Sequence, residues 1–375
     1  MELEASFDWV SLSMTPGLGS RLTGKLLRQF GSPEGIFRAS LTELESCRLP
    51  AAPAQAIHSR RSHKDAEEEL ARIRKFGCIL LNWDEPEYPQ RLLEIYDPPP
   101  LLYVRGDLSV LNKHSISMVG TRRPTPYGNQ VAERLGQDLA QRGLTVVSGM
   151  ARGIDSSAHS GACRASHGAT VGVLGTGVDV IYPKENRKLF GEVERRGALI
   201  SEFPLGSHPA PENFPVRNRI VAGMSLGVVV VQGAQYSGSL ITARLGMEFG
   251  REVYGIPGNV TVDVSFAPNQ LIKQGAKLVT SWEDVIEELP TAVRAELFPV
   301  EATTTAERAS LFADSLSPLE KKVFGLLSVD EAVHVDEIVE KSELSSSEVL
   351  AALCEMEMKS IVRQMPGKQF VKVLL

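Results

Sequence analysis

Glycine turns that carry arginines follow apolar runs in the middle of the chain, and the first of them reads GTRRPTPYG. In this turn Gly120 precedes Arg122 and Arg123. A guanidinium is a planar fork that fits phosphate oxygens, whereas two cations near the positive start of a helix contribute poorly to structure. We therefore expect both arginines to serve a phosphate ligand.

A second turn, SGMARGIDSSAHSGA, ends another apolar run at Ser148 and Gly149. Arg152 and Gly153 turn the chain, and Asp155 can cap the helix that follows. Backbone amides at the start of a helix attract anions. The amides of this turn, with Arg152 beside them, therefore predict a second anion site.

Two further turns repeat the pattern with weaker signals. The stretch GTGVDVIYPKEN brings Lys184 and Asn186 just past a glycine turn, where we expect another phosphate contact. The stretch QYSGSLITARLG places Ser237 and Gly238 at the start of a helix, so that its amides face the same region.

The remaining turn, PENFPVRNRI, combines Phe214 with Arg217, Asn218 and Arg219. Proteins bind single-stranded nucleic acids by stacking bases on aromatic rings and pairing cations with the backbone. An equally good alternative is that Phe214 tucks under its own loop. One mononucleotide would need about two such turns, whereas a tract of phosphates can use all five. The set therefore favours a nucleic-acid backbone as the ligand.

Short apolar runs alternate with helical patterns between residues 114 and 280, and each turn lies at the end of such a run. The runs fit buried parallel strands, and the patterns between them, such as residues 128–142, fit crossover helices. This alternation predicts an α/β fold with a doubly wound, Rossmann-like sheet that binds ligands outside the carboxyl ends of its strands. The dinucleotide fingerprint GxGxxG is missing, so we expect no cofactor.

The segments on either side of this region have their own patterns. The first reads as helices and contains PGLG, which resembles a helix-hairpin-helix turn, although a plain helix connection is the favoured interpretation. Near the end, three helices precede a hairpin, an order that resembles a winged helix. We expect a helical domain over residues 1–75, a Rossmann-like domain over 76–289 with bridging strands at 76–113, a linker over 290–314, and a winged helix over 315–375.

The 375-residue chain has a net charge of −6, which argues against a wholly basic nucleic-acid binder. Residues 115–280, however, hold 17 Lys and Arg against 12 Asp and Glu, while the rest of the chain holds 23 against 34. The four cysteines lie far apart and the histidines form no HExxH pair, so we expect no metal. The acidic N-terminus and the lack of a long apolar run predict a cytoplasmic protein without membrane contact.

The stretches VGTRRPTPYG, VVSGMARGIDSSAHSGA, GTGVDVIYPKEN, NFPVRNRIVAGMS and SGSLITARLGMEFGREVYGIPG keep an order and spacing that resemble the DprA/Smf family of DNA-processing proteins. The resemblance covers roughly residues 100–285, and the flanking segments match it in kind. It implies a single-stranded DNA binder of natural transformation that protects incoming DNA, helps load the RecA recombinase and forms a homodimer through the Rossmann-like domain. It implies no catalytic residue.

The family's binding loops carry over to positions of this chain that match them. By resemblance, the first arginine loop is Arg122 and Arg123, and the YPKEN lysine is Lys184. The remaining matches are Ser148, Gly149 and Arg152 in the glycine-rich loop, and Phe214, Arg217 and Arg219 in the NFPxRNRI segment.

Other functions fit the sequence less well. A nucleotide or nucleotide-sugar hydrolase of the phosphoribohydrolase type would need PGGxGTxxE, but GAQYSGSLITARLGME lacks the tight turn and Glu248 stands at the wrong offset. A dinucleotide-dependent oxidoreductase lacks its fingerprint, and His159 is expected to pack rather than to act as a base. In the winged helix, Glu348 and other acidic residues of the last helix predict contact with protein, or weak contact with duplex DNA.

Overall fold

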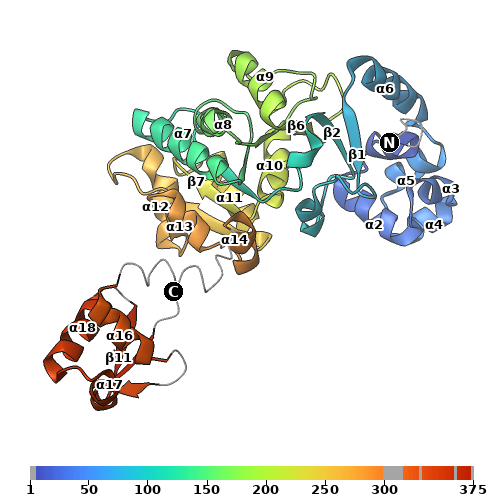
Figure 1. The fold of residues 1–375 in the computed structure, drawn as a ribbon. Helices are drawn as coiled ribbons and strands as arrows, with labels where there is room; N and C mark the ends of the chain where they lie inside the picture. The colour runs from blue at the N-terminus through green and yellow to red at the C-terminus, as the bar shows by residue number, and fades with distance from the viewer. Residues whose placement is uncertain (1–5, 299–315, 329–331, 359–360, 373–375) are drawn as a thin grey trace. The chain divides into compact units, whose positions relative to one another are not determined.

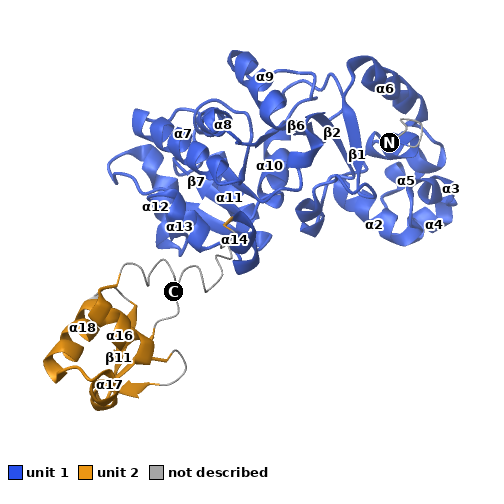
Figure 2. Cartoon of the chain, in the orientation of Figure 1, with its two compact units in different colours: residues 1–297 blue, residues 298–375 orange. Residues whose placement is uncertain are grey.

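The computed structural model divides the chain into two compact units, Met1–Leu297 and Phe298–Leu375 (Figure 2). The residues that it describes are 6–298, 316–328, 332–358 and 361–372. Helix α14 (Thr291–Leu297) occupies the start of the segment expected to be a linker. Its Val293 is buried against the sheet, so this part of the expectation is corrected, and residues 299–314 lie outside the described residues.

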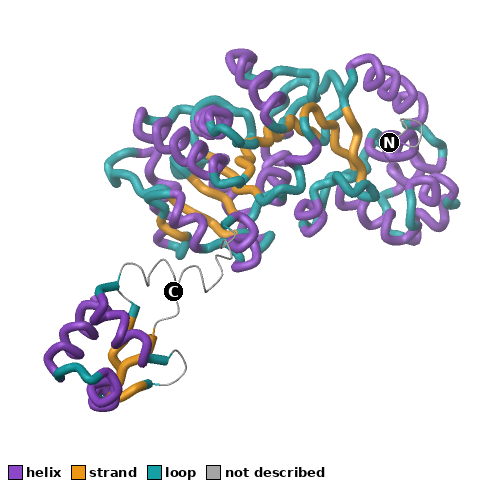
Figure 3. The backbone as a smooth tube through the Cα atoms, viewed as in Figure 1, coloured by secondary structure: helices purple, strands orange, loops and turns teal. Residues whose placement is uncertain are grey.

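The large unit is built on one nine-stranded sheet (Figures 1 and 3). Its strands are β1 (Ile79–Asn82), β2 (Leu101–Gly106), β3 (Ser115–Val119), β4 (Thr145–Ser148), β5 (Thr170–Val173), β6 (Ala198–Ser201), β7 (Gly227–Val230), β8 (Glu252–Gly255) and β9 (Lys277–Leu278). The order is β1-β2-β6-β5-β4-β3-β7-β8-β9. The seven strands β6-β5-β4-β3-β7-β8-β9 are all parallel, and β1 and β2 add an antiparallel edge.

Helices cover both faces of this sheet, as a doubly wound fold requires. They are α7 (Pro126–Gln141), α8 (Ile154–Arg164), α9 (Arg187–Arg196), α10 (Asn213–Gly223), α11 (Gly238–Glu248), α12 (Phe266–Lys273) and α13 (Trp282–Glu287). Strand β7 shows why the strands are apolar throughout. Val228 and Val230 pack with α10 and α11, while Val229 packs with α7 and α8 on the other face.

The chain changes direction across the sheet at strand β3. Strands β3 to β6 add successively toward one edge, whereas β7 returns to the other side of β3 and β8 and β9 continue from there. The loops that leave β3 and β7 therefore diverge to opposite faces, which opens a crevice at their carboxyl ends. The predicted α/β class and Rossmann-like topology are confirmed.

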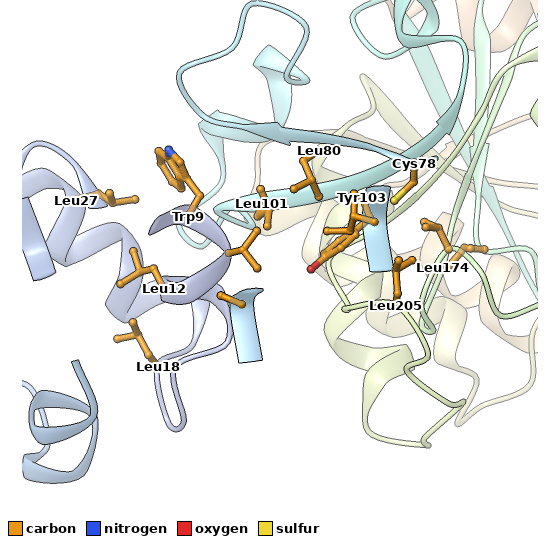
Figure 4. Packing of buried hydrophobic residues seen from close by; sticks show 14 of the residues in the cluster. Trp9, Leu12, Leu18, Leu27, Cys78, Leu80, Leu101, Tyr103, Leu174 and Leu205 are labelled. Atoms are coloured by element: carbon orange, nitrogen blue, oxygen red, sulfur yellow. The ribbon is translucent and has the colours of Figure 1, made fainter. Parts of the chain in front are cut away.

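The N-terminal helices share a core with the antiparallel edge of the sheet. They are α1 (Phe7–Ser13), α2 (Ser20–Phe30), α3 (Pro33–Arg38), α4 (Leu41–Ser46), α5 (Ala51–His58) and α6 (His63–Phe76). Trp9 and Leu12 of α1 belong to one buried cluster with Leu101 and Tyr103 of β2 (Figure 4). Glu69 of α6 also accepts the Leu205 backbone N–H at 2.7 Å. These contacts join the helices to the sheet as one packed unit.

The smaller unit has the helix and strand order of a winged helix, as expected. Its elements are α16 (Pro318–Leu326), β10 (Val333–His334), α17 (Val335–Ser342), α18 (Ser346–Met358), β11 (Val362–Met365) and β12 (Gln369–Lys372). The three strands pair in the order β10-β12-β11. A core of its own, with Val323, Ile338, Leu353 and Phe370, holds this unit together.

His159 lies in the packed layer between α8 and the sheet. Its side chain is fully buried, and Nδ1 lies 2.7 Å from the Thr170 hydroxyl oxygen. Burial, together with the positive charge of Arg217, lowers the pKa of His159 to about 3. The imidazole is therefore a neutral packing group, as expected, and not an available base.

The free energy of unfolding should depend on pH because this imidazole is buried in its neutral form. Below the ordinary pKa of 6.5 the unfolded chain binds a proton at His159 that the folded chain excludes. The free energy of unfolding should then fall by up to about 1.4 kcal/mol for each pH unit between pH 6.5 and 4. Urea unfolding of a His159→Asn variant should show a shallower pH slope. Thr170→Val removes the hydrogen bonds of the Thr170 hydroxyl to His159 and to the Val146 carbonyl but leaves the imidazole in place, so it should keep the wild-type slope. Equal slopes for all three proteins would contradict this assignment.

Candidate nucleic-acid interface

An open cavity of about 760 Å³ lies at the carboxyl ends of β3 and β7, where the sheet changes direction. We call it the trough. It is lined by Val119, Gly120, Thr121, Arg122, Arg123, Gly149, Ala151, Asp155, Tyr182, Pro209, Pro211, Phe214, Pro215, Arg217, Asn218, Val221, Ser237, Gly238, Ser239, Ile241 and Thr242. All five sequence turns thus contribute lining residues to one cavity, the stretch GTGVDVIYPKEN through Tyr182.

A smaller cavity extends the trough toward the end of β5. The two share Arg122, Gly149 and Phe214 as lining residues, and the smaller one adds Arg152 and Pro183. Pro183 directly precedes Lys184, the first residue of the short 3₁₀ helix η4 (Lys184–Asn186). The stretch GTGVDVIYPKEN therefore continues from the trough into this smaller cavity.

Arg122 and Arg123 are exposed on the loop after β3. Among the described residues, neither guanidinium has a carboxylate within ion-pair distance. The Arg122 guanidinium carbon lies 5.2 Å from the centroid of the Phe214 ring, in a cation–π arrangement. The loop itself is held by the Thr121 N–H, which donates to the Gln232 carbonyl at 2.7 Å. Two uncompensated cations are thus presented from a fixed backbone.

The cations at the other end of the interface differ in their surroundings. Lys184 is exposed and has no ion-pair partner within the described part of the chain. Arg152 donates to Glu185 at 2.6 Å, and both side chains are more than half exposed. Asn186 does not face a ligand, because its Nδ2 donates to the Met150 carbonyl and the Ser156 hydroxyl, both at 2.9 Å. This corrects the expectation of a phosphate contact from Asn186.

The amides of the second turn are already occupied by a side chain of the protein. Asp155 lies in the first turn of α8, and its Oδ2 accepts from the N–H groups of Gly149 at 3.1 Å and Ala151 at 3.4 Å. Burial raises the pKa of the Asp155 carboxyl, while Arg217 lowers it. Asp155 therefore organises the preceding loop instead of capping α8, and these two amides are not the expected anion site.

Arg217 forms a buried part of the trough floor. It is 4% exposed, and its Nη1 donates to the Val173 carbonyl at 2.9 Å. Burial lowers its pKa to about 10, and the nearby Asp155 carboxylate opposes that shift. A Cβ on Gly149 would overlap the guanidinium, so any other residue at that position would displace the Arg217 side chain. The Arg217 Nε has no hydrogen-bond partner in the described structure, which leaves one buried donor beside the trough.

Arg219 lies on the other side of α10, and the expectation that it contacts a phosphate is corrected. Two residues along a helix are about 200° apart, so Arg217 and Arg219 cannot both line the trough. Arg219 is 5% exposed and pairs with both carboxylate oxygens of Glu202 at 2.7 Å. It also donates to Asp97 at 3.2 Å and to Ser20 of α2 at 2.8 Å. This arginine is a structural link between the sheet and the N-terminal helices.

Two serines of the turns have structural contacts. Ser148 is fully buried and its hydroxyl donates to the Met118 carbonyl at 2.6 Å, so it does not reach the trough. Ser237 is the N-cap of α11, and its hydroxyl accepts from the Ser239 N–H at 3.3 Å. Ser237, Gly238 and the half-buried Asn218 line the trough as expected.

Phe214 and two glycines shape the trough. Phe214 is half-buried, packs 5.6 Å from the Tyr182 ring and sits against Gly175, so it is partly tucked under its loop. Gly153 has a φ of 78°, and a Cβ there would lie 2.5 Å from the Thr121 carbonyl. A Cβ on Gly120 would lie 2.5 Å from Ile154. Gly153 therefore acts as a turn residue, and Gly120 lets the first loop approach α8.

Some lining residues were not singled out from the sequence. Ser239 and Thr242 of α11 bring buried hydroxyls to the trough, and their i, i+3 spacing on a helix is the signal that identifies them. Tyr182 lies at both cavities, yet nothing in its sequence context distinguishes it from a core residue.

The described residues lack two features that would suggest other functions. No group of three His, Cys, Asp or Glu side chains within them is placed to hold a metal ion. No helix in this part of the chain combines the length and apolar character needed to cross a membrane.

Comparisons with known proteins agree with this architecture. The model of the DNA recombination-mediator protein A family matches residues 79–290, and that of the DprA winged helix domain matches residues 305–368. Protein Smf of Synechocystis sp. is 32% identical over 96% of this chain and 97% of its own length. DNA processing protein DprA of Bacillus subtilis is 44% identical over 59% of this chain and 74% of its own.

Two solved structures are similar as well. The X-ray structure of DprA from Streptococcus pneumoniae matches with a TM-score of 0.68 at 33% identity, over 77% of this chain and 98% of that one. DNA processing protein A from Helicobacter pylori, whose structure is described in terms of its single-stranded DNA binding mode, matches with a TM-score of 0.51 at 30% identity, over 56% of this chain and 94% of that one. From its sequence and its fold together, the chain belongs to the DprA/Smf family of DNA-processing proteins.

Proposed function

We propose that this protein is a non-enzymatic single-stranded DNA-binding protein that holds the strand backbone along the trough and its smaller extension. The observation that carries the proposal is the set of exposed cations at the carboxyl ends of the strands, Arg122, Arg123 and Lys184, which have no carboxylate partner among the described residues. Cations spread over two separate turns suit a polymer of phosphates better than one small anion. The binding mode described for the Helicobacter pylori relative supports this ligand class.

The alternative of a nucleotide or nucleotide-sugar hydrolase finds little support in the trough. Its carboxylate, Asp155, is buried and accepts two backbone N–H groups. Glu248, the acidic residue of the comparable segment, is the last residue of the 11-residue helix α11 that begins at the trough. At a rise of about 1.5 Å per residue it lies about 15 Å from that end. Neither group is placed as a general base.

Family membership also suggests partners. We propose that the protein delivers its bound strand to the RecA recombinase during natural transformation in the cytoplasm, and that it forms a homodimer through the Rossmann-like domain. The apolar pair Leu271 and Ile272 of α12 makes a poor dimer surface, because Leu271 is only 3% exposed and belongs to the core. The edge strand β9, with Leu278 at 48% exposed, is the better candidate.

Removing two of these exposed cations should weaken DNA binding and make it less dependent on salt. We expect Arg122→Ala combined with Lys184→Ala to bind a fluorescent oligo-dT more weakly, as measured by anisotropy across a salt series. The slope of log affinity against log salt should become shallower by about 1.4, because each neutralised phosphate of a single strand contributes about 0.7.

A matched control removes the same two charges elsewhere. Arg134 and Lys64 are exposed and line neither the trough nor its extension. The Arg134→Ala and Lys64→Ala double variant should keep the wild-type slope. An equal loss in both double variants, or binding by the wild type that does not respond to salt, would contradict the proposed function.

Glu185 is expected to restrain DNA binding, because it neutralises Arg152 and adds a negative charge beside Lys184. A Glu185→Gln variant should bind oligo-dT about two- to fivefold more tightly at low salt, within the range of an exposed ion pair. The gain should shrink as salt is raised. Unchanged or weaker binding at low salt would show that Arg152 does not contribute.

The winged-helix unit should be dispensable for strand binding. Helix α18 exposes Glu348, Glu355 and Glu357, whose charges repel phosphates, and the exposed cations Arg363 and Lys368 lie on the wing. A chain ending at Leu297, the boundary of the first compact unit, should bind oligo-dT within about threefold of the full chain. A loss beyond tenfold would assign the wing a role in the binding of single strands.

A further inference from the structure

Tyr236 has the greatest exposure of the large hydrophobic side chains in the described residues, at 92%. It lies in the loop between β7 and α11, directly before the N-cap Ser237. An aromatic ring left in water at this level makes few packing contacts of its own, so it contributes little to the folded core. Its position beside the trough suggests that a ligand covers it.

Tyr236 lines a second cavity of about 630 Å³, which we call the side groove. The residues that matter for its chemistry are Thr121, Tyr236, Ser237, Phe266, Gln270 and Lys273. Thr121 and Ser237 line both the side groove and the trough, so the two cavities share a wall. A strand whose backbone follows Arg122 and Arg123 therefore passes directly beside the side groove.

The lining of the side groove matches an unpaired nucleobase. Tyr236 and the 42%-exposed Phe266 offer aromatic faces on which a base can stack. Gln270 supplies both a hydrogen-bond donor and an acceptor for base edges. Lys273 is exposed and has no carboxylate within ion-pair distance in the described structure. The exposed Asp263 also lines the groove, so the groove carries one charge of each sign and its fit to a base depends on the aromatic rings and the amide.

The loop that carries Tyr236 is fixed before any ligand binds. The Gly233 N–H donates to the Val264 carbonyl at 2.6 Å, and the Ala267 N–H donates to the Gly233 carbonyl at 2.8 Å. The Ser237 N–H donates to the Ala234 carbonyl at 3.0 Å. Since the backbone on both sides of Tyr236 is already ordered, stacking a base on its ring requires little further ordering.

We propose that the side groove is a base-binding subsite in which Tyr236 stacks an unpaired base of the strand held in the trough. This inference rests on the proposed function and adds the part of the DNA that the trough does not contact. It also gives the protein a physical means to prefer single strands, because a base in a duplex is already stacked and paired and cannot lie on the ring.

The test compares Tyr236→Ala and Tyr236→Phe for anisotropy-detected binding of oligo-dT and of an abasic oligomer of the same length. We expect Tyr236→Ala to bind oligo-dT about 5- to 100-fold more weakly with an unchanged salt slope, since stacking involves no charge. Tyr236→Phe keeps the ring and should stay within about threefold of wild type. The abasic oligomer should bind wild type and Tyr236→Ala equally, because neither complex has a base stacked at position 236.

A matched control and a second readout make the outcome decisive. Tyr96 is 58% exposed and lines neither cavity, so Tyr96→Ala should bind like wild type. In a Tyr236→Trp variant, oligo-dT should quench the added tryptophan emission, and the abasic oligomer should not.

Three results would overturn the subsite. They are wild-type oligo-dT affinity in Tyr236→Ala, an equal loss for both oligomers, and a change of oligomeric state in Tyr236→Ala with unchanged DNA binding. The last would mean that a second copy of the chain covers the ring. The proposed function fails separately, if the wild type shows no salt-dependent binding of oligo-dT at all.

Discussion

The parallel alignment of seven strands is the constraint on which the interface depends. Each crossover helix returns the chain to the same starting end of the sheet, so the seven parallel strands all have their carboxyl ends on one side. Turns that are far apart in the sequence, such as those at Gly120 and Ser237, therefore become neighbours. The reversal of strand order between β3 and β7 opens the space between them. Without this topology the same arginines and lysines would be isolated surface charges.

Buried ion pairs below the trough decide which cations remain for a ligand. Arg219 forms ion pairs with Glu202 and Asp97, and Arg217 lies buried near Asp155. A buried charge that lacks a partner is strongly destabilising, so the main role of these contacts is to stabilise the fold. The NFPVRNRI segment thus contributes mainly the shape of the floor. The charge available to a backbone comes chiefly from Arg122, Arg123 and Lys184, with Arg152 shared with Glu185.

The sequence was sufficient to predict the sheet and the edge at which the site lies, because buried strands and glycine turns leave strong local patterns. It could not predict partners chosen in three dimensions. Nothing local shows that Asn186 bonds to Met150, that Ser148 bonds to Met118, or that Asp155 fills the amides expected to hold an anion. The same limit applies to Tyr236, whose exposure depends on how the loop after β7 packs against residues 264–267.

The net charge of −6 and a DNA ligand are compatible because the two act over different distances. At physiological salt the Debye length is about 8 Å, so acidic residues on other elements are largely screened from a phosphate in the trough. Contacts inside the trough are closer than that length and keep most of their strength. In the proposed complex the net charge would therefore govern the approach of the strand, whereas the local cations and the aromatic ring beside them would govern how firmly it is held. An acidic protein with this arrangement can bind a strand through a small number of contacts and still release it as salt or a competing partner changes the balance.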